Sequence, residues 1–376
     1  MKNKILCGDS LEVLKDFEDN YFDSVVTDPP YGLAFMGKKW DYDVPQVELW
    51  KEVYRVLKPG GHILSFVGSR TYHRMAVNIE DAGFEIRDML GWLYGSGFPK
   101  SHNIGKAVDK LQGNKREVLG TEKRLMQPSN SMGGGVDGAK MGERTITKGN
   151  SEWEGWGTAL KPAHEPIVMA RKPFNTSVAE NVLTHGTGGI NIDECRVGTE
   201  TMKFQKASSL GNEKTMEGGK AKQDYTKDDT QGRFPANIMH DGSEEVLEIF
   251  EESSRFFYCA KASKAERNMG LDDYEEKQVT DGTIRSNQET ARTFGANSAK
   301  RKNYHPTVKP IKLMEYLVRL VTPKEGIVLE PFAGSGTTLI ACKQQGFNYI
   351  GIEREQEYCD IAEARLKGVQ VQGELF

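Results

Sequence analysis

Short apolar runs alternate with amphipathic stretches at both ends of the chain, and this alternation predicts strands and helices in turn. Before residue 100, the pattern predicts strands at 4–7, 22–27, 61–67 and 84–94 and helices at 11–15, 47–57 and 71–82. Toward the other end, it predicts helices at 311–321, 339–345 and 358–366 and strands at 327–330 and 349–353. Strands that alternate with helices favour a parallel sheet. The predicted fold class is therefore α/β, with a doubly wound, mostly parallel sheet.

The middle of the chain lacks this regular pattern. Residues 100–172 are rich in Gly, Ser, Asn and Lys and carry 13 Lys and Arg against 8 Asp and Glu. We interpret most of this segment, about 100–160, as a long basic loop. Residues 163–171 regain strand character and are predicted to pair with the strand at 84–94, so that the basic loop forms the tip of a hairpin.

Residues 173–303 are the least regular part of the sequence. The pattern there indicates β-like pieces at 189–192 and 256–259 and a helix at 243–250, separated by polar tracts. We interpret this region as an insertion between two halves of one core, which would comprise residues 1–172 and 304–376.

The composition of the 376 residues, with 28% charged and 37% hydrophobic positions, is typical of a soluble globular protein. No apolar stretch approaches the length of a membrane span, and the N-terminus leads directly into a predicted strand, so we expect a cytoplasmic protein without membrane partners. The five cysteines stand singly, without Cys-x-x-Cys pairs or histidines at ligand spacing, which supports neither a metal site nor a disulfide framework.

One candidate site is the segment Thr27-Asp28-Pro29-Pro30-Tyr31, which directly follows a predicted buried strand. The two prolines fix the backbone and remove two N–H donors, which leaves the carbonyl groups of this loop free to accept hydrogen bonds. Asp28 adds a carboxylate and Tyr31 an aromatic face. Together these groups suit a planar ring that bears an amino group. On its own, the segment could equally be a proline-rich turn.

A second candidate site is the loop Phe332-Ala333-Gly334-Ser335-Gly336, between a predicted strand and a predicted helix. Such a loop lets the backbone approach a ligand, and Glu353, at the end of the next strand, could accept both hydroxyls of a ribose. No Gly-Lys-Ser/Thr follows, which excludes a Walker phosphate loop, and Leu339 replaces the third glycine of a dinucleotide site. The pattern favours an adenosine-bearing ligand without a pyrophosphate.

Three motifs together resemble one family. Asp-Pro-Pro-Tyr at 28–31, His-Pro-Thr-x-Lys-Pro at 305–310 and Pro-Phe-x-Gly-x-Gly at 331–336 resemble the signature of S-adenosylmethionine-dependent DNA amino-methyltransferases. The catalytic motif precedes the cofactor motif, as in the beta class of bacterial and phage enzymes. The resemblance implies a Rossmann-like core of the class I methyltransferase type with a permuted motif order, and it gives residues 173–303 the place of the target-recognition region.

The resemblance also implies roles for individual residues. Asp28 and the Pro29 carbonyl would hold the amino group of the target base, Tyr31 would stack on the base, and Pro30 completes the catalytic motif. The methionine part of the cofactor would lie against Phe332, Gly334 and Gly336, with help from Thr307 and Lys309. Glu353 would hold the ribose, Asp9 would lie near the adenine, and Glu330 belongs to the same set of cofactor residues.

Several activities compete with this interpretation. Carbon-5 methylation of cytosine requires a cysteine nucleophile, usually after a proline, and no Pro-Cys pair occurs. Methylation of the 4-amino group of cytosine is the nearest rival; enzymes of that type usually carry Ser where this chain has Asp28, which favours adenine. RNA and glutamine amino-methyltransferases tend to carry Asn there. A catalytically silent nucleic-acid-binding module would not need both motifs intact.

The expected partner is double-stranded DNA. Because the target base must leave the duplex, we expect the basic segment 100–172 to contact phosphates around it. The resemblance leaves open a homodimer and a partner restriction endonuclease.

Overall fold

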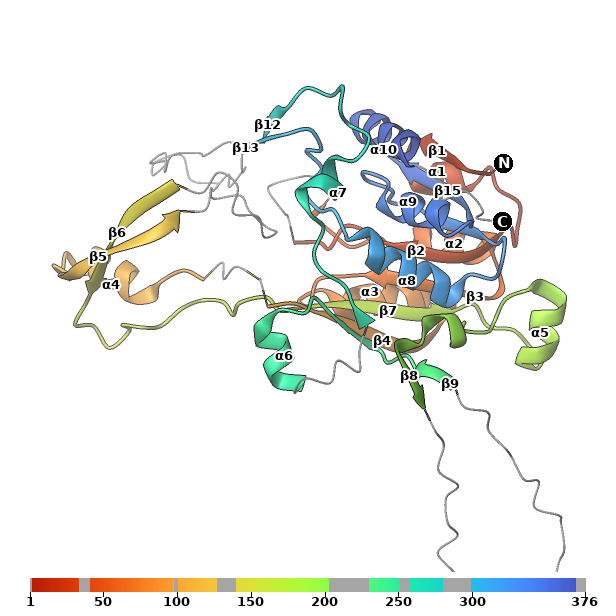
Figure 1. Ribbon diagram of the computed structural model, residues 1–376, viewed down its shortest axis with the longest axis horizontal. Coiled ribbons are helices and arrows are strands. Elements are labelled where there is room, and N and C mark those ends of the chain that lie inside the picture. The colour runs from red at the N-terminus through yellow and green to blue at the C-terminus, as the bar shows by residue number, and fades with distance from the viewer. Residues whose placement is uncertain are drawn as a thin grey trace, which may run out of the picture.

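The computed structural model describes residues 2–33, 41–95, 97, 101–126, 140–202, 230–250, 257–279 and 299–369. Within these ranges one sheet has nine strands (Figure 1). Across the sheet they are β1 (Lys4–Cys7), β15 (Asn348–Glu353), β14 (Ile327–Glu330), β2 (Phe22–Thr27), β3 (Leu57–Phe66), β7 (His164–Arg171), β4 (Glu85–Leu93), β10 (Ile238–His240) and β11 (Phe257–Tyr258). Neighbouring strands run parallel except where β7 is one of the pair, which confirms the predicted mostly parallel sheet.

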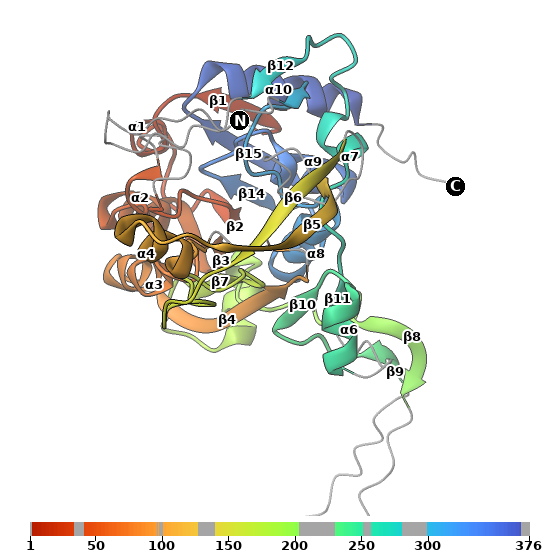
Figure 2. The same cartoon turned by 90° about the vertical axis from the view of Figure 1, so that its left-hand side faces the viewer.

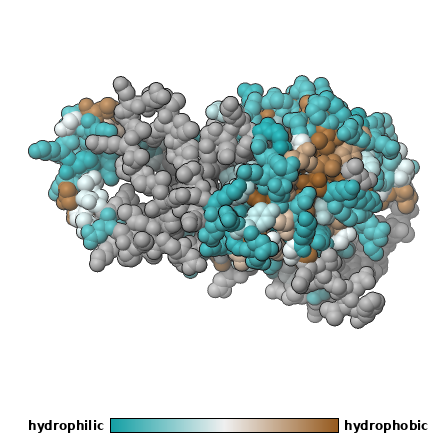
Figure 3. Space-filling model, turned by 90° about the horizontal axis from the view of Figure 1, so that it is seen from above, coloured by the Kyte–Doolittle hydropathy of each residue, from teal (hydrophilic) through white to brown (hydrophobic). Residues whose placement is uncertain are grey.

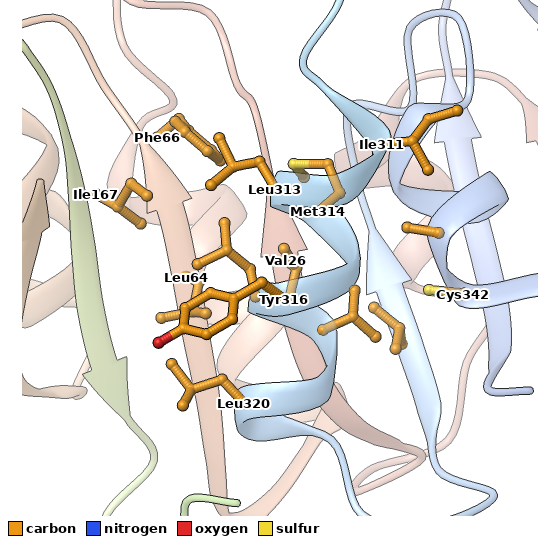
Figure 4. Close-up of a cluster of buried hydrophobic side chains, with 14 of the residues drawn as sticks. Val26, Leu64, Phe66, Ile167, Ile311, Leu313, Met314, Tyr316, Leu320 and Cys342 are labelled. Carbon is orange, nitrogen blue, oxygen red and sulfur yellow. The ribbon is translucent and has the colours of Figure 1, made fainter. Parts of the chain in front are cut away.

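Helices cover both faces of this sheet. One face carries α1 (Ser10–Leu14), α2 (Val47–Val56) and α3 (Tyr72–Asp81); the other carries α8 (Ile311–Val321) and α9 (Thr337–Gln344), with α10 (Gln356–Gly368) beside α9. Because successive strand side chains point to opposite faces, Val25 belongs to the core under α2 whereas Val26 packs under α8. Figure 4 shows the second core, where Leu313 and Tyr316 of α8 lie over Leu64 of β3.

The predicted hairpin between strands 84–94 and 163–171 is confirmed. β4 and β7 pair antiparallel, with Leu90 opposite Ile167 and Trp92 opposite Glu165. The strand predicted to begin at Gly61 begins earlier, at Leu57, directly after α2. Residues 58–61 lie between two registered pairs, Phe22 with Leu57 and Ser24 with His62, so they form a bulge. Gly60 adopts φ +81° there, which a glycine tolerates without strain.

The expectation of a long basic loop at about 100–160 is wrong where this segment forms regular elements. The segment contains α4 (Ile104–Gln112) and a separate hairpin of β5 (Glu117–Met126) with β6 (Lys140–Lys148). We call α4 and this hairpin together the arm. The arm extends away from the core, whose described surface is largely hydrophilic (Figures 1 and 3). At its base, Arg116 forms ion pairs with Asp109 and, at 2.7 Å, with Glu154. The β-strands of the arm pair with each other and not with the core, so their sequence shows no alternation of apolar and polar positions.

The inserted region contributes to the core. The predicted helix at 243–250 is confirmed as α6 (Glu244–Phe250), and β11 confirms part of the piece predicted at 256–259. The strand predicted at 189–192 is wrong, because those residues form no regular element and lead into a 3-10 turn, η3 (Asp193–Cys195). The remaining elements were not predicted: α5 (Val178–His185), β8 (Val197–Met202) with β9 (Thr230–Arg233), β10, α7 (Lys264–Asn268), and β12 (Lys277–Val279) with β13 (Ala299–Arg301). β10 and β11 extend the main sheet beyond β4.

Two further observations concern the described residues. None of the helices in these ranges is long and apolar enough to cross a membrane, and no group of three or more potential ligands there could hold a metal ion. All five cysteines lie in the described ranges as free thiols.

Candidate active site

The two candidate loops lie side by side at one edge of the sheet. β2 and β14 pair in parallel, with Val25 opposite Leu329, so the loops that follow them emerge at the same edge. A pocket lies between them. Its empty space, counted together with the open solvent at its mouth, is about 310 Å³. Its lining combines both motifs: Asp28, His305, Thr307, Lys309, Met314, Glu330, Phe332, Ala333, Gly334, Ser335, Thr337 and Thr338.

Asp28 is held by two donors. Its Oδ1 accepts a hydrogen bond from the Tyr31 hydroxyl at 2.7 Å, and its Oδ2 accepts one from Lys309 Nζ at 2.6 Å. Lys309 Nζ also lies 3.0 Å from the Tyr31 hydroxyl. The pKa of Tyr31 is raised well above its usual value, mainly by burial and to a lesser extent by the charges of Asp28 and Glu165. The Tyr31 hydroxyl therefore remains protonated. The structure therefore joins the Asp-Pro-Pro-Tyr motif to the His-Pro-Thr-x-Lys-Pro motif through one ammonium group.

Lys309 is almost enclosed, with 9% of its side chain exposed, and it faces a second carboxylate. Glu165 Oε2, on β7, lies 3.4 Å from Lys309 Nζ. Burial acts to lower the pKa of Lys309, but the carboxylates of Asp28 and Glu165 outweigh it and the pKa is raised. The side chain therefore stays an ammonium ion. Its Nζ lies 4.8 Å from the centre of the Phe66 ring.

A buried carboxylate fixes the backbone of the first loop. Asp41 accepts hydrogen bonds from the backbone N–H groups of Tyr31 at 2.6 Å, Gly32 at 3.0 Å and Leu33 at 3.3 Å. Thr71 donates to the Tyr31 carbonyl at 2.7 Å. These contacts hold Tyr31 at the edge of the sheet. Pro29 is buried and Pro30 half-buried in the same loop, and neither is part of the pocket lining.

The glycine loop requires its two glycines. Gly334 and Gly336 adopt φ values of +52° and +80°, in the left-handed region. A Cβ at Gly334 would lie 2.8 Å from His305 Nε2, and one at Gly336 would lie 2.9 Å from the Ala362 Cβ. Gly336 is also the N-cap of α9, so the free N–H groups of that helix begin at the pocket, where Thr337 and Thr338 line it.

Glu353 and Asp9 lie at the ends of neighbouring strands, outside the pocket lining. Glu353 Oε2 accepts from the Gly334 N–H at 2.8 Å, and burial raises the pKa of Glu353. Cys7 of β1 is registered with Glu353 of β15, which puts Asp9 just beyond the same edge. Asp9 is exposed and accepts from the Leu11 N–H at 3.0 Å, so it also caps α1.

Glu330 is a buried carboxyl group beneath the pocket, with 1% of its surface exposed. Its Oε1 accepts from the Thr27 hydroxyl at 2.5 Å and from the Phe332 N–H at 3.0 Å, and its Oε2 accepts from the Thr338 hydroxyl at 2.7 Å. Burial raises the pKa of Glu330 to about 8 although these donors favour the ionised form. The carboxyl group thus links β2, the glycine loop and α9.

Sequence reasoning missed several residues of this site. His305 borders the pocket, with its Nδ1 2.9 Å from the Thr307 carbonyl, and burial lowers its pKa to about 4, so it is neutral at pH 7. It opens the His-Pro-Thr-x-Lys-Pro motif, and this motif was the signal by which it could have been found. Glu165 is the second residue of β7. The predicted hairpin of β7 with β4 already implied that this end of the strand lies at the edge of the sheet that carries Asp28. Asp41 gave no sequence signal.

The fold and the paired loops define a class of α/β protein in which a carboxylate loop and a glycine loop border one pocket at the edge of a mostly parallel sheet. A family model described as DNA methylase, N6_N4_Mtase, matches residues 22–364, and the chain belongs to this family.

Curated relatives match over most of the chain. The Type II methyltransferase M.HindIII of Haemophilus influenzae is 25% identical over 324 residues, which cover 85% of this chain and 68% of the relative. The Type II methyltransferase M.HpaI of Haemophilus parainfluenzae is 24% identical over 379 residues, which cover 97% of this chain and 74% of the relative.

Similar solved structures include the M1.HpyAVI–SAM complex, with a TM-score of 0.43 and 18% identity over 96% of this chain and 99% of that one. The PvuII DNA methyltransferase (cytosine-N4-specific) has a TM-score of 0.46 and 15% identity over 96% of this chain and 85% of that one.

The raised pKa of Glu330 predicts how stability depends on pH. Between its ordinary value of 4.5 and about 8, the folded state binds a proton that the unfolded state has released, so the free energy of unfolding should fall as pH rises. Glu330→Gln lacks this titration. As the pH rises from 5.5 to 8, the free energy of unfolding of this variant should therefore increase by about 1–3 kcal/mol relative to that of the unsubstituted protein. Urea unfolding at each pH, without ligands, measures this difference.

The matched control is Glu363→Gln, at an exposed carboxylate on α10. This variant should follow the pH dependence of the unsubstituted protein. If Glu330→Gln also followed it at every pH, Glu330 would be ionised in the folded state throughout this range.

Proposed function

We propose that this protein transfers a methyl group from S-adenosylmethionine to the 6-amino group of an adenine flipped out of duplex DNA. The observation that carries the proposal is the shared pocket, in which Asp28 and the glycine loop at Gly334 line the same cavity. A methyl donor on one wall and an amine on the other would meet there. Family membership supports DNA as the substrate. We propose the cytoplasm as the location of the enzyme, because bacterial DNA lies there.

The residues present fit this cofactor. The glycine loop forms a cradle that a Cβ at Gly334 would fill, and the start of α9 offers unpaired N–H groups. S-adenosylmethionine supplies an electrophilic methyl group on a sulfonium. The methionine part would lie against Phe332, Gly334 and Gly336, near Thr307, Lys309 and Glu330; the ribose would lie on Glu353, with the adenine toward Asp9.

Asp28 would activate the target amine. The lone pair of an exocyclic amine is delocalised into the ring, and hydrogen bonds from its N–H groups to Asp28 and to the Pro29 carbonyl favour a tetrahedral, more nucleophilic nitrogen. The carboxylate also stabilises the positive charge that develops on nitrogen during transfer. Tyr31, held by Asp41 and Thr71, would present its ring to the base. The rigid loop supplies the alignment on which much of the rate depends.

We expect the arm to contact the duplex around the target. The chain leaves the sheet after β4 and returns at β7, with the arm between them (Figure 2). Because β2 and β4 run in the same direction, the arm begins at the edge of the sheet that carries Asp28. Lys110, Lys115 and Lys148 are exposed on it. At its base, the exposed rings of Trp153 and Trp156 pack edge to face, with centroids 5.2 Å apart. Exposed cations next to an active site for DNA suit the phosphate backbone.

The function is tested by incubating the protein with labelled S-adenosylmethionine and bacterial DNA, digesting the DNA to nucleosides and identifying the labelled product by mass. The proposal predicts 6-methyladenine. A product of 4-methylcytosine would keep the fold and the mechanism and reject adenine as the target. A protein that binds the cofactor but labels neither nucleoside would reject the proposed activity.

Asp28→Asn should abolish most transfer without affecting cofactor binding. The amide keeps the size of the side chain but loses the negative charge, so the single-turnover rate should fall by about 10³-fold or more. The dissociation constant for S-adenosylmethionine, measured by titration calorimetry, should change less than about threefold. Asp19→Asn is the control, because this exposed carboxylate lies before the start of β2, at the end of the strand opposite to Asp28. Near-normal transfer by Asp28→Asn would exclude the catalytic role.

Replacing Lys110, Lys115 and Lys148 together by Gln should weaken DNA binding about tenfold at moderate salt and lower the slope of log affinity against log salt by about 0.9 for each lost phosphate contact. Fluorescence anisotropy with a labelled duplex measures both quantities. The control replaces Lys15, Lys324 and Lys367, which are exposed near the opposite edge of the sheet. Equal salt slopes for the two triple variants would show that the arm does not contact the backbone.

A further inference from the structure

Lys309 poses an electrostatic problem for the proposed reaction. Its ammonium lies 2.6 Å from the Asp28 oxygen that the target amine would approach, and the Tyr31 hydroxyl already occupies the other oxygen. During methyl transfer a positive charge develops on the nitrogen of the amine. An ammonium that stayed on Asp28 would compete for the acceptor and repel that charge.

Glu165 offers Lys309 another position. Its Oε2 is buried and has no hydrogen-bond partner among the described residues, although it lies only 3.4 Å from Lys309 Nζ. A buried carboxylate oxygen without a donor is uncommon in folded proteins. A small movement of the flexible lysine side chain, away from Asp28, would complete this hydrogen bond.

The surroundings of Glu165 hold it in place and bring a second cation near it. Its backbone is registered with Trp92 in the β4–β7 hairpin. Tyr94 lies close enough for the charge of Glu165 to contribute, after burial, to the raised pKa of the phenol. Lys261, from the inserted region, lies with its Nζ 3.8 Å from the centre of the Tyr94 ring and adds a second positive charge near Glu165.

We propose that Glu165 is a positioning residue that receives Lys309 when the target amine reaches Asp28. The ammonium moves from the Asp28 carboxylate to the Glu165 carboxylate, and Asp28 becomes free to accept the N–H groups of the base. No covalent bond changes in this step, and the net charge of the three side chains is conserved. The proposal rests on the proposed function, because it assumes an amine as the substrate.

The test compares Glu165→Gln with Glu85→Gln, a carboxylate at the opposite end of the same hairpin that pairs with Arg171. Single-turnover methyl transfer is measured at saturating S-adenosylmethionine and DNA. Glu165→Gln should slow transfer about tenfold, because the amide attracts the ammonium less strongly. Its thermal midpoint and its affinities for cofactor and DNA should match those of Glu85→Gln, which should transfer at the unsubstituted rate. Glu165→Asp, which keeps the charge, should recover part of the rate.

A double-substitution cycle separates this role from a structural one. Lys309→Met removes the competing ammonium together with its proposed contact to the cofactor, so the rate of this variant serves as the reference. Adding Glu165→Gln to it should change that rate less than twofold, because Glu165 acts only through Lys309. An unchanged rate for Glu165→Gln alone, or an equal tenfold loss in both backgrounds, would overturn the proposal. Failure of the unsubstituted protein to methylate an amino group in DNA is a separate result, which would reject the proposed function before any variant is compared.

Discussion

The parallel pairing of β2 with β14 is the constraint on which the site depends. These strands are separated by about 300 residues of sequence, yet Ser24 is registered with Val328. Side chains anchor the pair at both ends: Asp23 accepts from the Ile327 N–H at 2.7 Å at one end, and Thr27 donates to Glu330 at 2.5 Å at the other. The loops that follow the strands therefore emerge next to each other, and the Asp28 motif and the glycine motif border one pocket.

The inserted region supports this site from outside the sheet. Glu266 of α7 accepts from the Ile311 N–H at 2.5 Å, at the start of α8, and Arg267 donates to the His305 carbonyl at 3.3 Å. The fully buried Arg365 of α10 donates to the carbonyls of Ser335 at 2.6 Å and Glu266 at 3.2 Å. One short helix of the insertion thus connects the loop before α8 with the glycine loop. A change in the position of α7 would be transmitted to the loop that carries His305 and, through Arg365, to the glycine loop.

The sequence predicted those parts of the fold in which local pattern and burial agree. The strands at Phe22–Thr27 and Ile327–Glu330 are short buried runs that end at motif loops, and their boundaries were predicted correctly. The arm was missed because an isolated, exposed hairpin leaves no apolar alternation. α5 was missed although Ser177 and Glu180 form a capping box, because the residues that follow show no strong apolar face. The ammonium bridge from Lys309 to Asp28 and Glu165 joins three distant segments, and only the sheet order brings them together.

The central claim is that cofactor and amine meet in the one pocket between Asp28 and Gly334. The most direct measurement is a crystal structure of the protein with a non-transferring analogue of S-adenosylmethionine and a duplex that contains a site the protein methylates. The account predicts a flipped base whose amino group lies within hydrogen-bonding distance of Asp28 and the Pro29 carbonyl, with the analogue seated against the glycine loop. A base bound away from Asp28, or an analogue whose methionine part lies away from the glycine loop, would contradict it.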